Sequence, residues 1–134
     1  MPGEFIDSNV LLYLTSADPG KAARAEQLIQ RKPMVSVQVL NEITNVTRKK
    51  FRRTWSEVTE LLGRLTPLLD VHPVTRTMHQ DALRLAARYQ MQWWDSLLAA
   101  AALSLDCHTL YSEDMHAGLV IDDQLTIVNP FAPA

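Results

Sequence analysis

The chain has 134 residues, of which 47% are hydrophobic and 21% charged, the proportions of an ordinary soluble globular protein. This length predicts one domain, residues 1–134, with a substantial core, and the composition excludes a disordered chain or a coiled coil. The formal net charge of −2 does not by itself indicate a nucleic-acid-binding protein, although the distribution of charge matters more than its sum.

Targeting and redox signals are absent from the sequence. No apolar run approaches the roughly 20 residues that a membrane span requires. The first residues, Met1 to Glu4, lack the basic region of a secretory signal, and the single cysteine, Cys107, cannot form an internal disulfide. We therefore expect a cytoplasmic protein with no membrane partner, in which Cys107 is a small buried residue.

In chain order, short apolar runs alternate with segments of helical periodicity. Asp18-Pro19 is a strong helix start, and the segment Thr54-Trp55-Ser56-Glu57 is a capping box. Strands are predicted at 5–6, 34–36, 69–72, 109–112 and 126–128. Helices are predicted at 19–30, 37–50, 55–65, 75–89 and 95–105. This alternation predicts an α/β fold, a three-layer α/β/α sandwich around a mainly parallel central sheet.

Four acidic residues lie where predicted strands end or on predicted helices. Asp7 and Asp114 each follow a strand, Glu42 lies on the polar face of an amphipathic helix, and Asp95 opens the alanine-rich helix. In an α/β chain these positions converge on one edge of the sheet. Two carboxylates about 4–5 Å apart repel by roughly 3–4 kcal/mol at an effective dielectric near 20. Such a group requires a cation, so the pattern predicts a divalent-metal hydrolase of phosphodiesters.

Each acid alone has a simpler interpretation as a helix cap or a solvated side chain. The joint spacing of the four acids is what favours a metal site. Oxygen ligands without Cys–His pairing favour Mg²⁺ or Mn²⁺ over structural zinc. An aspartate-nucleophile phosphatase would require a second Asp two residues after Asp7, where Asn9 stands. No glycine-rich nucleotide-binding motif is present.

Five segments together resemble the PIN domain and, within it, the VapC-type toxins of bacterial toxin–antitoxin pairs. They are Phe-Ile-Asp-Ser-Asn-Val-Leu-Leu-Tyr at 5–13, Val-Ser-Val-Gln-Val-Leu-Asn-Glu at 35–42, Trp-Trp-Asp-Ser-Leu-Leu-Ala-Ala-Ala-Ala at 93–102, Thr-Leu-Tyr-Ser-Glu-Asp-Met at 109–115 and Asn-Pro-Phe at 129–131. The resemblance covers nearly the whole chain.

The resemblance implies an endoribonuclease that depends on Mg²⁺, with Mn²⁺ as an alternative, and that has an RNA substrate, a cognate antitoxin and a homodimeric state. Its catalytic metal ligands would be Asp7, Glu42, Asp95 and Asp114. Glu113 is a less favoured candidate for the fourth place, and Ser112 fits the Ser/Thr position before that pair. Two alternatives stay open: a housekeeping RNA-processing PIN nuclease without an antitoxin, and a non-catalytic interaction module.

The densest basic run follows the helix that carries Glu42. It predicts phosphate contacts with RNA, with Trp55 as a possible stacking surface, although a solvated helix end is an equally simple interpretation. His116 is a further candidate for a phosphate contact. The predicted RNA-binding residues are Arg48, Lys49, Lys50, Arg52 and Arg53.

Overall fold

The computed structural model describes residues 3–133 and contains a six-stranded sheet in the order β3-β2-β1-β4-β6-β5. Five strands are parallel, and β5 runs antiparallel to β6. The strands are β1 (Gly3–Ile6), β2 (Met34–Ser36), β3 (Asp70–His72), β4 (Cys107–Tyr111), β5 (Val120–Ile121) and β6 (Leu125–Val128). The predicted three-layer arrangement is confirmed.

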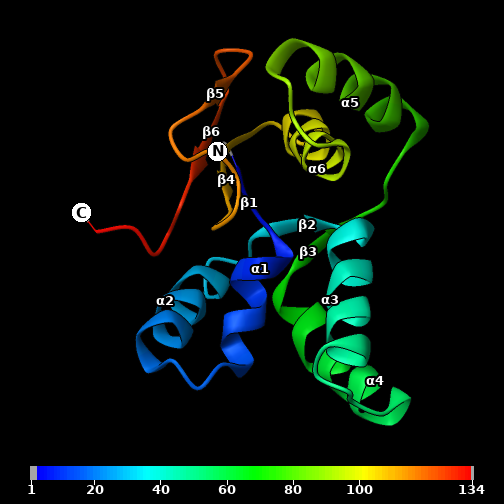
Figure 1. Ribbon diagram of the computed structural model, residues 1–134, viewed down its shortest axis with the longest axis vertical. Coiled ribbons are helices and arrows are strands. Elements are labelled where there is room, and N and C mark those ends of the chain that lie inside the picture. Colours follow the sequence, from blue (N-terminus) through cyan, green and yellow to red (C-terminus); the bar gives the residue numbers. More distant parts are fainter. Residues whose placement is uncertain (1–2, 134) are drawn as a thin grey trace.

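Helices lie on both sides of this sheet. In Figure 1, α5 and α6 lie on one side of the strands and the helices α1 to α4 lie on the other. The helices are α1 (Ser8–Leu11), the 3₁₀ turn η1 (Leu12–Thr15), α2 (Pro19–Ile29), α3 (Val37–Lys49), α4 (Trp55–Leu65), the 3₁₀ turn η2 (Thr66–Leu68), α5 (Arg76–Tyr89) and α6 (Trp93–Ser104).

The strand order reverses between β1 and β4. From β1 the chain adds β2 and β3 on one side, whereas β4 pairs with the other side of β1 and leads to β6. The carboxyl ends of β1 and β4 therefore lie next to each other at a topological switch point, where open α/β sheets bind ligands. Asp7 directly follows β1, and Ser112 directly follows β4.

Local signals placed most elements correctly. The Asp18 carboxylate accepts hydrogen bonds from the amides of Gly20 and Lys21, and both bonds of the Thr54–Glu57 capping box are present. α6 begins at Trp93, two residues before the predicted start, so Asp95 lies within its first turn. Cys107 is fully buried, as predicted, and burial raises the pKa of its thiol to about 12.

The short strand β5 is absent from the sequence-based prediction. It has only two residues, within the apolar run Leu119-Val120-Ile121, which is too short to show the alternation of a strand. The reversal into β6 uses Asp122 and Asp123, both with positive φ, a conformation that Asp tolerates better than most residues. Within residues 3–133, no helix is long and apolar enough to cross a membrane.

Candidate metal centre

Asp7 lies at the centre of the candidate site and is only 5% exposed. It follows β1 and caps α1, so the backbone amide of Ser8 donates a hydrogen bond of 2.7 Å to its Oδ1. From β4, the Ser112 hydroxyl donates to its Oδ2 at 2.9 Å. Both carboxylate oxygens are thus fixed by donors from two neighbouring strand ends.

Glu42 comes to the same place from α3. The Ser8 hydroxyl donates to its Oε2 at 2.8 Å, and the Gln38 amide donates to its Oε1 at 2.9 Å. Gln38 also donates to the backbone carbonyl of Trp94 at 3.2 Å, which links α3 to the first turn of α6, where Asp95 lies.

Asn9 connects the first and fourth acids. Its amide nitrogen lies 3.4 Å from Oδ2 of Asp7 and 3.2 Å from Oδ2 of Asp114. Its side-chain carbonyl accepts a hydrogen bond of 3.2 Å from the backbone amide of Glu113. Asn9 therefore orients the segment that carries Asp114 relative to Asp7.

The electrostatics show that the four acids act on one another. Burial, together with the negative charges of Glu42 and Asp95, raises the pKa of Asp7 to about 6, against the hydrogen bonds from Ser112 and Ser8, which lower it. Burial also raises the pKa of Asp95, and Glu42 and Asp114 act in the same direction. These pKa effects show that Asp7, Glu42, Asp95 and Asp114 lie close enough to influence one another. Their role as metal ligands stays a prediction.

No cationic side chain neutralises this cluster: among residues 3–133, none of the four acids has an ion-pair partner. Within the same part of the chain, no three His, Cys, Asp or Glu side chains are spaced to hold a metal ion as they stand. The residue types suit Mg²⁺ or Mn²⁺, because carboxylate oxygens are the hard donors that these ions prefer.

Glu113 points away from the acid cluster and makes an ion pair. Its carboxylate accepts hydrogen bonds of 2.6 Å from both Lys21 and Tyr13, and Lys21 also lies over the rings of Tyr13 and Phe131. Burial raises the pKa of Glu113, but these two donors outweigh that effect and hold it below the usual value. Of the two adjacent candidates for the fourth position, Asp114 is therefore the unpaired one.

The predicted RNA-binding segment is divided between two surfaces. Arg48 and Lys49 line a hollow beside Trp55, and the Arg48 guanidinium lies 4.6 Å from the centre of that ring. Lys50 and Arg53 line a separate groove that also includes Asn9 and Asp114.

Sequence reasoning missed three polar residues of the site. Ser8, Asn9 and Gln38 hold the carboxylates in place, although none was predicted to be functional. Ser8 and Asn9 directly follow Asp7, and Gln38 precedes Glu42 by one helical turn. Their proximity to the acids was the available signal.

Residues 5–117 match the family model of the PIN domain, so the chain belongs to the PIN domain family. No curated protein matches this sequence.

The fold resembles several solved structures, at sequence identities of 20% or less. A toxin–antitoxin complex from Klebsiella pneumoniae superposes with a TM-score of 0.73 and 17% identity, covering 96% of this chain and 98% of that one. FitAcB from Neisseria gonorrhoeae superposes with a TM-score of 0.63 and 17% identity, again covering 96% of this chain and 98% of that one. VapC20 from Mycobacterium tuberculosis, a toxin that cleaves the sarcin–ricin loop, superposes with a TM-score of 0.62 and 20% identity. That match covers 80% of this chain and 86% of VapC20.

Proposed function

We propose that this protein is a metal-dependent endoribonuclease and the toxin of a toxin–antitoxin pair. PIN domains are nucleases. The observation that carries the proposal is the meeting of four acids, one of them almost completely buried, at the switch point of the sheet without a cationic partner. A non-catalytic module would gain nothing from a buried carboxylate held beside other acids, since burying an unpaired charge costs free energy.

The chain's own residues would prepare the site for an ion. Asp7, Glu42, Asp95 and Asp114 would hold Mg²⁺ or Mn²⁺, and Ser8, Ser112 and Asn9 would keep these carboxylates oriented. A bound ion supplies Lewis-acid polarisation of a phosphate oxygen and a water of lowered pKa for in-line attack. Because water is the nucleophile in that chemistry, the hydroxyls of Ser8 and Ser112 act as hydrogen-bond donors and need no activation.

The partners follow from the same proposal. Several solved structures of this fold are complexes of a toxin with its antitoxin. An antitoxin would present an Arg or Lys to the carboxylates and so occupy the electrostatic place of the metal. The protein would act as a homodimer in the cytoplasm, and light scattering should give a mass of twice 15.1 kDa.

The test is the replacement of one ligand without loss of volume. Asp95→Asn and Asp7→Asn should each abolish RNA cleavage in Mg²⁺ and remove growth toxicity, whereas Asp114→Asn should be milder because water can replace a peripheral ligand. Asp123→Asn is the matched control, since it removes the same charge from the exposed turn between β5 and β6. Mapping new RNA ends after induced expression measures the activity. Full cleavage by Asp95→Asn would refute the assignment.

A further inference from the structure

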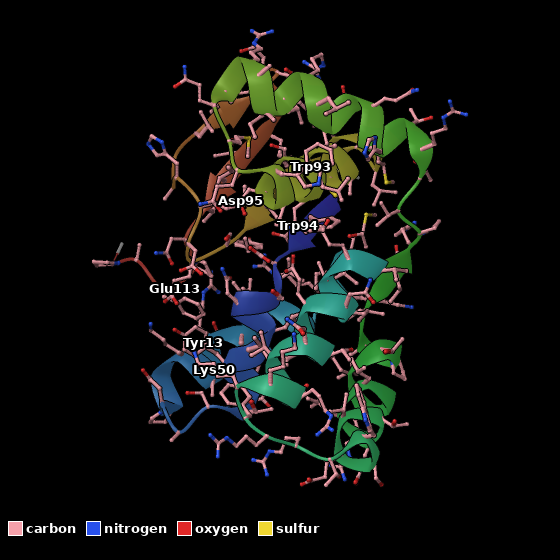
Figure 2. The ribbon with its side chains drawn as sticks, turned by 45° about the vertical axis from the view of Figure 1, so that its right-hand side comes forward. Tyr13, Lys50, Trp93, Trp94, Asp95 and Glu113 are labelled. Atoms are coloured by element: carbon pink, nitrogen blue, oxygen red, sulfur yellow. The ribbon has the colours of Figure 1, made fainter. Side chains whose placement is uncertain are left out.

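A groove of about 830 Å³ adjoins the acid cluster. Asn9 and Asp114 line it on the side of the candidate site, and Lys50 and Phe51 line it where α3 ends. Figure 2 shows Tyr13, Lys50 and Glu113, all of which line this groove, on the same side of the molecule. Its volume lies in the range of pockets that enclose a small organic ligand, which is enough for a nucleotide.

The helical end of α3 separates two neighbouring basic residues. α3 ends at Lys49, and its C-cap, Lys50, keeps a right-handed helical conformation. Consecutive residues of a helix point about 100° apart around its axis, because one turn takes about 3.6 residues. Lys50 accordingly lines the groove, whereas Lys49 lines the other hollow, beside Trp55. Two lysines that are adjacent in the sequence thus lie on different surfaces.

Basic and acidic side chains both line the groove, and those without an ion-pair partner among the described residues are Lys50 and Asp114. Arg53 pairs with Glu57 at 3.6 Å, and Arg64, also in the lining, pairs with Glu60. In the part of the chain that the structure describes, the Lys50 ammonium has no ion-pair partner.

An aromatic side chain stands next to that charge. Phe51 is 44% exposed and lines the groove together with half-buried apolar residues such as Val46 and Leu61. A basic side chain beside an exposed aromatic ring and apolar side chains is a combination that binds single-stranded nucleic acid. The basic side chain contacts a phosphate, and the ring stacks on a base.

We propose that this groove binds the single-stranded RNA on one side of the scissile phosphate, with Lys50 on a backbone phosphate and Phe51 stacked on a base. The inference rests on the proposed function, because it takes the acid cluster as the place of cleavage. Continuity with that cluster favours RNA as the occupant: a strand whose phosphate lies at Asp114 must leave along the adjoining surface. Arg48, Lys49 and Trp55 then lie outside the path of the strand.

The experiment measures RNA binding without cleavage. A short fluorescently labelled oligouridylate is titrated with the full chain in EDTA, and anisotropy is followed at several salt concentrations. Two pairs of variants are matched: Lys50→Gln with Lys49→Gln, and Phe51→Ala with Trp55→Ala. Each pair makes a closely similar chemical change inside and outside the groove, and thermal unfolding checks that all four variants fold.

The expected result is specific to the groove. Lys50→Gln should weaken binding and reduce the log–log salt slope by about 0.7, the value for one phosphate contact on a single strand. Phe51→Ala should weaken binding about fivefold or more with the slope unchanged, because stacking releases no counterions. Lys49→Gln and Trp55→Ala should bind as the wild type does.

Other outcomes overturn the inference. Equal losses in Lys49→Gln and Lys50→Gln would mean diffuse attraction without a groove. Unchanged RNA binding in both Lys50→Gln and Phe51→Ala would mean that RNA does not bind in the groove and that a protein segment is its occupant. In either case, Mg²⁺-dependent RNA cleavage by the wild type would still support the proposed function. If RNA binding depends on Lys50 and Phe51 but the wild type cleaves no RNA, the proposed function is refuted and the RNA-binding groove is retained.

Discussion

Asp7 is the residue on which the candidate site depends most. It is the most buried of the four acids, and it accepts hydrogen bonds from Ser8 and Ser112 while Glu42 and Asp95 repel its charge. Burial and repulsion outweigh the hydrogen bonds, so its pKa is raised to about 6. The site thus contains a carboxylate that is destabilised in its charged form until a cation arrives.

The stability of the metal-free protein should depend on the protonation of Asp7. Its pKa rises from 3.8 to about 6 on folding, so between these pH values the folded state binds more protons than the unfolded state. The contribution of Asp7 to the free energy of unfolding is therefore present below about pH 4 and is lost as pH rises through 6, by at most about 3 kcal/mol. Urea unfolding in EDTA across this window measures it.

The comparison with Asp7→Asn isolates this effect. The pKa values of Glu4 and Glu113 are lowered, so these residues act in the opposite sense in both proteins. The difference in the free energy of unfolding between the two proteins should shift in favour of Asp7→Asn as pH rises. If the free energies of unfolding of the two proteins vary with pH in parallel, the pKa of Asp7 is not raised by folding.

Lys21 should position the fourth acid through Glu113. Lys21→Met preserves much of the side chain's volume beside Tyr13 and Phe131 but releases the Glu113 carboxylate, which precedes Asp114. Because the partners that orient ligands influence metal affinity strongly, Mn²⁺ binding should weaken about tenfold by calorimetry. The free energy of unfolding should change little, since exposed ion pairs contribute little to stability. Arg31→Met, which breaks the ion pair with Glu4, is the control and should bind Mn²⁺ normally.

At the level of elements, the acids depend on how helices begin and strands end. Asp7 caps α1 directly after β1, Asp95 lies in the first turn of α6, and Glu42 projects from α3 one turn after Gln38. Helix starts are favourable places for carboxylates because the exposed amides and the helix dipole stabilise negative charge. The helix starts at Asp7 and Asp95 therefore offset part of the electrostatic repulsion between the acids.

The capping box of α4 should contribute measurably to stability. Thr54 accepts from the Glu57 amide at 3.1 Å, and the Glu57 carboxylate accepts from the Thr54 amide at 2.9 Å. Thr54→Ala should lower the free energy of unfolding by about 1 kcal/mol, measured by urea denaturation. Thr59→Ala, in the exposed middle of α4, should have no cost or a small gain, since Ala has the higher helix propensity. Equal losses in both variants would argue against a role for the cap.

At the scale of the whole molecule, the similar solved structures and the unpaired acids concern the same question, namely what neutralises the cluster. Under the proposed function, a metal ion or a cationic side chain of an antitoxin would do so. The likeness in fold extends over nearly the entire length of the toxin–antitoxin complex from Klebsiella pneumoniae and of FitAcB from Neisseria gonorrhoeae.

Expression of the chain alone should arrest growth, and co-expression with a small protein encoded beside it should restore growth. The two proteins should purify together, because the antitoxin covers the acid cluster and the apolar surface near it. The measurement is growth after induction, followed by affinity purification through a tag on this chain. If the chain is harmless and no small partner purifies with it, yet it cleaves RNA in Mg²⁺, the protein is a housekeeping nuclease and not a toxin.

The sequence by itself determined the elements and the acid positions. Periodicity, the caps at Asp18 and Thr54, and the placement of Asp7 and Asp114 after strands are local properties, so neighbouring residues are sufficient to define them. The family match over residues 5–117 confirms the resemblance that these motifs indicated. Four elements of two to four residues, β5, α1, η1 and η2, were not predicted, because such short segments have no period of their own.

The tertiary structure alone decided which side chains meet. The sequence favoured Asp114 over Glu113 without a structural reason, and the structure supplies one: Lys21, 92 residues before Glu113, binds Glu113 and leaves Asp114 unpaired. Asn9 reaches Asp114 across 105 residues, and Lys49 and Lys50 line different hollows because different segments lie beside each of them. These outcomes depend on contacts between distant segments, which have no signature in the local pattern of residues.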